Sequence, residues 1–173
     1  GASSDGDVIN IAPGTYIERI ITNGGKSLTI QGTLNSDGSL ATTIDAQGSS
    51  TNPGTWGEHI FDLSTPNGLV VLKNLELTGG YASYGGAVHF KNGSLTLDGC
   101  HIHGNYTRVK GTIGRADGNN SYCLLTMKNC TFENNNSGGY AGSYSRSSMA
   151  YYNGGLNHPN DLIIQDCMFS NGM

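Results

Sequence analysis

Charged residues are scarce in this chain, and it contains no block of like charge. Only 13% of the 173 residues are Asp, Glu, Lys or Arg, and the formal net charge is −4. A surface that binds nucleic acid needs clustered Lys and Arg, so this composition argues against a nucleic-acid partner. No apolar run approaches about 18 residues, so we expect no membrane-spanning helix. The 27 glycines and the 36% of hydrophobic residues favour many short strands joined by turns.

The sequence also lacks a CxxC pair, which argues against a zinc site made of thiolates. Its four cysteines would allow two disulfides. Three of them, Cys100, Cys130 and Cys167, instead occupy one position of a repeat, where Leu75 stands in the first copy. Cys is among the most often buried residue types. We therefore favour free, buried cysteines over disulfides, with Cys123 outside this register, and we expect no cofactor.

Internal repetition is the strongest pattern in the chain. Four segments, which begin at Val70, Leu95, Leu125 and Leu162, read apolar-x-apolar, two turn-prone residues, Leu or Cys, x, apolar, then a Gly/Asn pair. Alternating apolar residues predict a strand, and the polar pair predicts a bend. One strand–bend–strand unit per repeat is the way a β-solenoid coil is built. The sequence therefore predicts an all-β parallel solenoid.

Equivalent residues of such a stack should form ladders about 4.8 Å apart. We predict two inward ladders and one outward ladder with alternating charge. These are Leu75–Cys100–Cys130–Cys167, Leu77–Ile102–Phe132–Phe169 and Lys73–Asp98–Lys128–Gln165.

The whole chain, 1–173, is predicted to be one domain and a fragment of a longer chain. Residues 1–58 would form N-terminal coils, and 59–173 would form four repeat coils. The repeat anchors are spaced by 25, 30 and 37 residues, so the surplus should bulge out as long loops at 106–122 and 138–160. A third strand per coil is predicted at 61–63 and 88–90, with a less regular copy at 113–115, where Arg115 takes an apolar position.

Two sets of motifs resemble known proteins. The segments 6–18, 26–32 and 43–48 resemble the opening coils of the pectate-lyase-like superfamily of right-handed parallel β-helix proteins. Gly85-Gly-Ala-Val88 and Phe132-Glu-Asn-Asn135 resemble the GGA-[ILV] and FxxN motifs of chlamydial polymorphic outer-membrane proteins and related adhesins. The resemblance implies a single-stranded right-handed parallel β-helix with loop insertions between coils. It leaves the function open, because this fold serves lyases, hydrolases, adhesins and structural proteins.

One polar face carries a candidate metal site. His101 and His103 should lie on one face of a strand, with Glu76 and Glu133 on the neighbouring coils. Imidazole and carboxylate groups together can bind a divalent metal. The alternative is an ordinary solvated surface, and a simple cross-strand pair is favoured for Asp62 and His89.

A Tyr- and Ser-rich segment within 138–160 is the candidate binding loop. Tyrosine supplies rigid contact area with a polar tip, which suits a glycan or protein ligand. Its candidate binding residues are Tyr140, Tyr144, Arg146, Tyr151 and Tyr152. The alternative is packing of the loop on the flank of the stack.

Five N-x-S/T sequons fit an extracellular glycoprotein, although Asn105 and Asn129 could equally form structural turns. The sequons begin at Asn92, Asn105, Asn119, Asn129 and Asn135. Paired carboxylic acids for polysaccharide cleavage are not recognisable. We therefore favour a non-enzymatic structural or adhesive module, at the cell surface or secreted, which assembles with itself or with a larger partner and contacts glycans. A polysaccharide lyase or hydrolase and an autotransporter passenger fragment are the alternatives.

Overall fold

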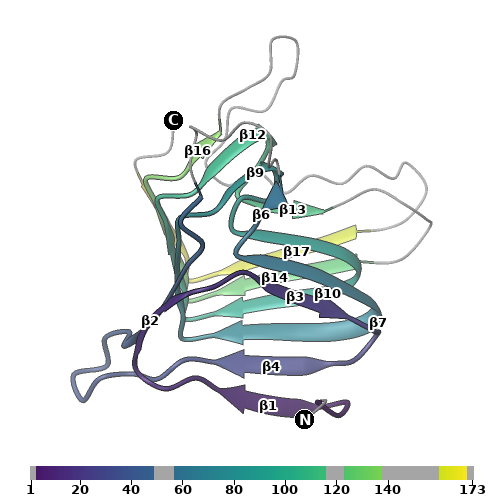
Figure 1. Cartoon of the computed structure of the whole chain (residues 1–173), viewed down its shortest axis with the longest axis horizontal. Helices are drawn as coiled ribbons and strands as arrows, with labels where there is room; N and C mark the ends of the chain where they lie inside the picture. Colours follow the sequence, from purple (N-terminus) through teal and green to yellow (C-terminus); the bar gives the residue numbers. More distant parts are fainter. Residues whose placement is uncertain (1–2, 49–56, 116–122, 138–159, 171–173) are drawn as a thin grey trace.

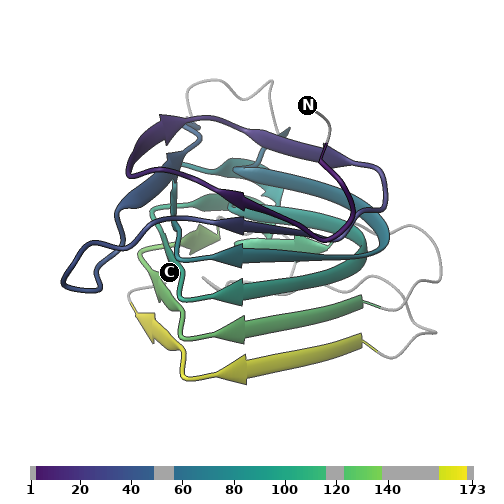
Figure 2. The same cartoon turned by 90° about the horizontal axis from the view of Figure 1, so that it is seen from below.

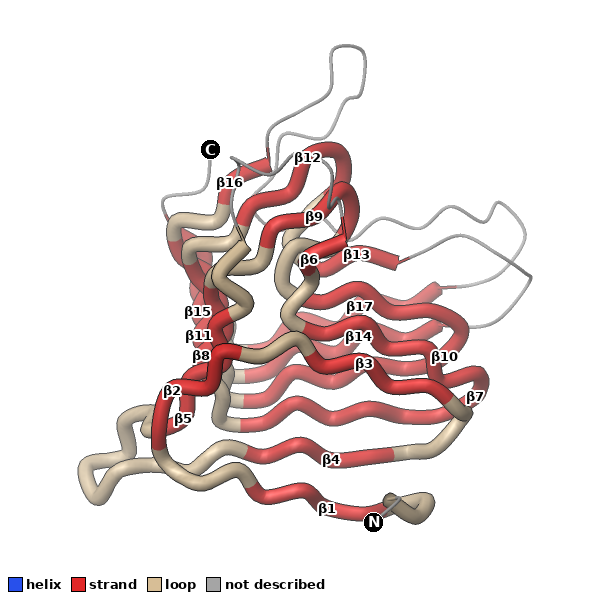
Figure 3. Tube along the Cα trace, viewed as in Figure 1, coloured by secondary structure: helices blue, strands red, loops and turns tan. Residues whose placement is uncertain are grey.

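The computed structural model describes residues 3–48, 57–115, 123–137 and 160–170 (Figure 1). Every regular element of these residues is a β-strand, and they contain no helix that could span a membrane (Figure 3). The prediction of an all-β chain is therefore confirmed for the described residues.

The largest sheet has eight strands, and every pair in it is parallel. Two of its strands, β7 and β10, are long enough to pair along two successive segments. The sheet contains, in spatial order, β1 (Asp7–Asn10), β4 (Leu28–Gln31), β7 (Phe61–Lys73), β10 (Val88–Asp98), β14 (Cys123–Lys128) and β17 (Asn160–Gln165), with β3 (Ile20–Asn23) on β7 and β13 (Ile113–Arg115) on β10.

Two smaller sheets complete the arrangement. The second sheet is parallel throughout, whereas the third contains one antiparallel pair, β6 with β9. The second sheet has the order β18 (Met168–Ser170), β15 (Thr131–Glu133), β11 (His101–His103), β8 (Glu76–Thr78), β5 (Thr42–Asp45) and β2 (Gly14–Ile17). The third has the order β16 (Asn136–Ser137), β12 (Tyr106–Lys110), β9 (Tyr81–Tyr84) and β6 (Gly57–Glu58).

The chain passes through these sheets in a repeating order, so each sequence repeat supplies one rung to the stack. Figure 2 shows the rungs following one another from the purple N-terminal strands to the yellow strands at the other end. This parallel arrangement is compatible with a parallel β-helix.

The bend after the large-sheet strand of each of the four repeat rungs depends on the left-handed backbone conformation. One residue of each of these rungs has a φ between 50° and 64°, and in the first three rungs its backbone N–H donates to the next rung, as Gly99 does to Lys128 O at 2.9 Å. Only Gly, Asn and Asp adopt this conformation at low cost, which explains the turn-prone residue before each anchor. The four residues are Asn74, Gly99, Asn129 and Asp166.

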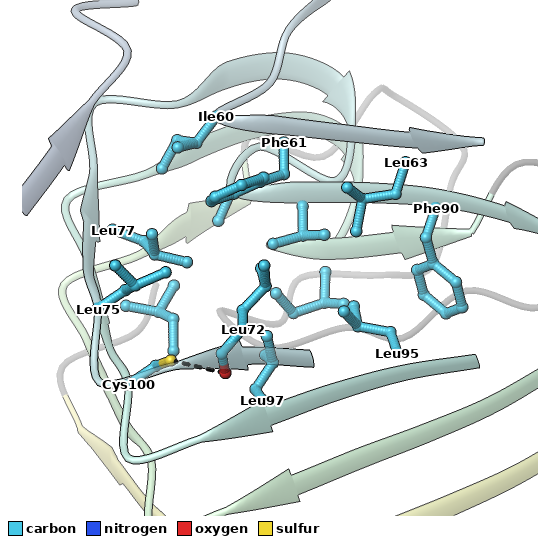
Figure 4. Packing of buried hydrophobic residues seen from close by; sticks show 14 of the residues in the cluster. Ile60, Phe61, Leu63, Leu72, Leu75, Leu77, Phe90, Leu95, Leu97 and Cys100 are labelled. Carbon is cyan, nitrogen blue, oxygen red and sulfur yellow. Dashed lines mark hydrogen bonds between the residues drawn. The ribbon is translucent and has the colours of Figure 1, made fainter. Parts of the chain in front are cut away.

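The core lies between the sheets (Figure 4), and the backbone bonds between successive anchors confirm the predicted cysteine ladder. Leu75, Cys100 and Cys130 are at most 2% exposed, and Cys167 is partly buried against the core that contains them. Backbone bonds link their rungs, since His101 N–H donates to Leu75 O at 3.0 Å. The three cysteines are free, and the Cys100 thiol donates to the carbonyl of Leu72 at 3.3 Å. The side chain of Cys123 lies outside the described residues.

The other two predicted ladders are also confirmed by the strand registers. Phe132 stands opposite Phe169, and their rings stack with centroids 5.0 Å apart. Asp98 stands between Lys73 and Lys128 on the outward face of the large sheet. In these registers the apolar ladders face the core and the charged ladder faces outward, as the repeat predicts.

The loop predicted at 106–122 is shorter than expected. Residues 106–110 form β12, and 113–115 form β13, because Tyr106 pairs with Tyr81 and Ile113 pairs with Val88. The third strand predicted at 113–115 is therefore present, with Arg115 opposite Phe90. Residues 116–122 and 138–159 lie outside the described residues, and β17 already begins at residue 160.

The Gly-Gly-Ala motif is explained by close backbone contacts. A Cβ atom on Gly86 would lie 2.5 Å from the carbonyl oxygen of Tyr106, and one on Gly80 would lie 1.9 Å from the carbonyl oxygen of Gly86. Real Cβ atoms do not approach backbone oxygens so closely. The side-chain hydroxyl of Thr107 instead accepts a hydrogen bond from Gly86 N–H at 3.1 Å.

Candidate functional site

The outward face of the second sheet brings together the four residues that the sequence analysis grouped. The register pairs His101 with Glu76 on β8 and His103 with Glu133 on β15. Strands β8, β11 and β15 lie side by side (Figure 3). Because side chains two residues apart point to the same face of a strand, both imidazoles stand between the two carboxylates.

The contacts within this cluster run diagonally across the rungs. Glu76 Oε1 lies 2.8 Å from His103 Nε2 and 4.0 Å from His101 Nδ1. Glu133 Oε2 lies 3.5 Å from His101 Nε2. The two imidazole rings are 4.5 Å apart and tilted by 31°. All four side chains are between 29% and 38% exposed, so the cluster is open to solvent.

The charge state of Glu76 reflects these neighbours. Partial burial by itself would raise the pKa of the Glu76 carboxyl. Hydrogen bonds from the Thr43 hydroxyl and from His103, together with the charges of His103 and His101, outweigh burial and lower this pKa below its usual value. Glu76 is therefore held as a carboxylate, which can pair with a protonated imidazole or coordinate a cation.

A second group of possible ligands lies where β7 and β10 begin. His59, Asp62 and His89 place one ligand atom each within 4.8 Å of one another. His89 Nδ1 lies 2.9 Å from Asp62 Oδ1, which is the cross-strand pair expected from the sequence. His59 stacks on His89 with ring centroids 4.6 Å apart, and its Nδ1 lies 2.9 Å from Gly85 O. His59 was not predicted, because it precedes the strand and no repeat pattern sets its register.

Two of the predicted glycosylation asparagines are structural. Asn105 and Asn135 are each 1% exposed, and the Asn105 side-chain amide donates to Leu77 O at 3.1 Å and to Asn135 Oδ1 at 3.0 Å. The Asn135 side-chain amide donates to Ile102 O at 2.8 Å. Attachment of a glycan would remove these buried hydrogen bonds, so neither side chain is available to carry one in the folded protein.

The remaining sequons stay predictions. Asn129 is exposed, and its side-chain amide donates to Asp98 Oδ1 at 3.2 Å. Asn92 lies in β10, and nothing is described of its side chain. Asn119 lies outside the described residues.

The candidate binding loop also stays a prediction. Tyr140, Tyr144, Arg146, Tyr151 and Tyr152 all lie outside the described residues. On the third sheet, the rings of Tyr81 and Tyr106 stack with centroids 4.7 Å apart.

Comparisons with protein-family models, curated proteins and solved structures give no match.

Proposed function

We propose that the chain is a structural or adhesive module of an extracellular assembly, without catalytic activity. Its fold would be a single-stranded right-handed parallel β-helix. The observation that carries this proposal is the apolar surface at both ends of the stack of rungs.

In the last described rung, residues of the inward ladders are exposed to solvent, because no further rung packs on them. Three inner residues that are at most 1% exposed are followed, in the same columns, by residues that are 40% to 43% exposed. At the opposite end, Ile9 is 41% exposed, although its strand partner Ile30 is 3% exposed. Burial of such surface is favourable by about 25 cal/mol per Å². The column pairs at the first end are Leu125 and Leu162, Met127 and Ile164, and Phe132 and Phe169.

We propose that a further rung covers each of these surfaces, and a second copy of the chain can supply it. β1 and β17 are the two end strands of the largest sheet, and β2 and β18 are those of the second. The edge of a sheet offers a row of backbone N–H and C=O groups for a further strand. Because all strands of these two sheets are parallel, β1 of one copy can continue the sheet beyond β17 of another. Head-to-tail contacts of this kind repeat, and they generate filaments or rings.

General rules for parallel sheets support the right-handed coil. Crossovers between parallel strands of one sheet are right-handed in about 98% of known cases. The resemblance of the opening coils to right-handed β-helix proteins points the same way. Extracellular placement rests on that resemblance and on the sequons at Asn92, Asn119 and Asn129.

A polysaccharide lyase or hydrolase remains the alternative function. Three of the outward carboxylates, Asp62, Glu76 and Glu133, each lie within 4.0 Å of a histidine ring, whereas a glycosidase needs a pair of carboxylic acids that face the substrate. We expect no release of unsaturated oligosaccharides from pectate or alginate. Ultraviolet absorbance measures this release, and a signal above the blank would contradict the non-enzymatic assignment.

Assembly is tested by static light scattering of the purified chain over a concentration series. We expect the molar mass to rise above the 18.1 kDa of one chain. Phe169→Lys should suppress the rise, because it places a charge in the apolar end column. Met168→Lys is the matched control, since Met168 is 59% exposed and stands opposite Thr131 in an outward column.

Three outcomes would contradict the end-to-end contact. The first is a wild-type chain that stays monomeric at every concentration. The second is equal suppression by both Lys variants, which would show a general effect of charge. The third is Phe169→Lys assembling like wild type. Circular dichroism of each variant checks that its strands are retained.

A further inference from the structure

We propose that Glu76, His101 and His103 bind one divalent transition-metal ion of the zinc class, and that Glu133 orients His101. The site joins two neighbouring rungs, because Glu76 lies on β8 and both histidines lie on β11. It is independent of the end-to-end contact, since it lies on the outward face of inner rungs.

The spacing of the ligand atoms fits such an ion. One ligand atom from each of Glu76, His101 and His103 lies within 4.8 Å of the other two. A tetrahedral zinc ion has Zn–N and Zn–O bonds of about 2.0–2.2 Å, which places its ligand atoms about 3.3 Å apart. The distances from Glu76 Oε1 to His103 Nε2 and to His101 Nδ1 are 2.8 Å and 4.0 Å. Rotations of the side chains are therefore enough to bring the three atoms onto one ion.

The second nitrogen of His101 faces a carboxylate, as the second nitrogen of a metal-bound histidine often does. His101 Nε2 is buried and forms no hydrogen bond, although Glu133 Oε2 lies 3.5 Å away. A metal on Nδ1 leaves the ring proton on Nε2, which then donates to the Glu133 carboxylate. Histidine ligands of metals regularly donate their second nitrogen to a carboxylate in this way. Glu133 is therefore a positioning residue and not a ligand.

The carboxylate of Glu76 is oriented in the same manner. The Thr43 hydroxyl, from the rung on the other side, donates to Glu76 Oε2. This bond leaves Oε1 facing both imidazole rings. The three ligands thus have support from β5 on one side and from β15 on the other.

The ligand chemistry selects the class of metal. Calcium and magnesium take oxygen ligands, and several of them. Two imidazole nitrogens and one carboxylate oxygen suit zinc, copper, nickel or ferrous iron. Three protein ligands leave a fourth position of a tetrahedral ion for water, and the 29% to 32% exposure of the three side chains gives that water access.

The test uses the full chain after treatment with EDTA and titration calorimetry with Zn²⁺. We expect one tight site in the wild type. Glu76→Gln and His103→Gln should each weaken it by at least about 100-fold, whereas Glu133→Gln should weaken it by about 10-fold, as loss of an orienting group does. His89→Gln and Asp98→Asn are the matched controls, and they should leave this binding unchanged.

Nuclear magnetic resonance of the imidazole nitrogens supplies a second readout that a structural role would not move. On addition of Zn²⁺, the Nδ1 resonance of His101 and the Nε2 resonance of His103 should shift together. Wild-type affinity in both ligand variants, or loss of binding only in His89→Gln, would overturn the site. If Glu133→Gln weakens binding as strongly as Glu76→Gln, Glu133 is a ligand and its assignment as a positioning residue is wrong.

Discussion

The side-chain amide of Asn105 donates to the side-chain oxygen of Asn135 on the next rung at 3.0 Å, and both side chains are buried. Asn105 Oδ1 in turn accepts the backbone N–H of Gly80 at 2.9 Å on the rung before. Three successive rungs are therefore joined at this corner by hydrogen bonds of asparagine side chains and not by backbone-to-backbone bonds alone.

Substitution of Asn105 by Ala should destabilise the protein, because the Gly80 N–H would be left buried without an acceptor. Each buried polar group without a partner costs roughly 1–3 kcal/mol. Denaturation in urea measures the loss. Asn129→Gly is the control, since Asn129 is exposed and its φ of 52° suits glycine. A loss of stability in Asn105→Ala no larger than in the control would show that this corner bond is not important.

A methyl group at Gly86 should also be poorly tolerated. Its carbon would stand 2.5 Å from Tyr106 O, so the two rungs would have to separate. Overpacking of this kind costs roughly 1–3 kcal/mol, and thermal denaturation of Gly86→Ala measures it. Gly104→Asn is the matched control, because Asn134 already has the same left-handed conformation two residues after Phe132. Equal melting temperatures for the two variants would contradict the contact.

The three ladder cysteines should differ in their rate of alkylation. The hydrogen bond shared with Cys100, followed by burial, raises the pKa of the Cys130 thiol. Burial also raises the pKa of Cys167, although its side chain is only partly buried. The thiolate is the reactive form, and the hydrogen bond with Cys130 lowers the pKa of Cys100. The reagent must also reach the sulfur, however, and Cys100 and Cys130 are at most 2% exposed, so burial should protect both in the folded chain. Peptide mass spectrometry after iodoacetamide treatment should therefore find Cys167 modified first. Modification of Cys130 before Cys167 would contradict this ordering.

Removal of metal should lower the thermal stability of the chain. An ion that binds only the folded state stabilises it by about 2.7 kcal/mol at a concentration 100 times its dissociation constant. The melting temperature should therefore rise with added Zn²⁺ and fall again with EDTA. The variant His103→Gln should show no such change, whereas Asp98→Asn should respond like the wild type. A response in His103→Gln equal to that of the wild type would place the ion elsewhere.

The registers of the inner rungs could be predicted because one pattern recurs in each. Leu77 and Ile102 fill equivalent positions, and a shift by one residue would expose every apolar side chain of the strand. The N-terminal rungs carry no such repeat. The pairing of β3 with β7, which sets Ile20 opposite Phe61, was therefore not predicted, nor was the antiparallel contact of β6 with β9.

For the candidate metal cluster, the sequence predicted which residues lie close together but not which of their atoms are in contact. The repeat places Glu76 beside His101 on adjacent rungs, because strand register is set by the backbone and by the apolar columns. It does not determine which nitrogen of His101 faces which carboxylate. That choice depends on side-chain rotamers and on the hydrogen bond from Thr43, which belongs to a rung with a different sequence pattern.

The likeness of the inner rungs has a consequence for how such a chain can change in length. The rung that contains Cys100 meets the rungs before and after it through the same columns, and the same left-handed corner precedes each anchor. After a tandem duplication of one such unit, each side chain of the new rung would pack against residues at the same repeat positions as in the existing rungs. The molecule could therefore be lengthened one unit at a time without a new core, while its bends carry inserts of different size. Growth by duplication needs no simultaneous substitutions elsewhere, and a single recombination event within the repeats would produce it.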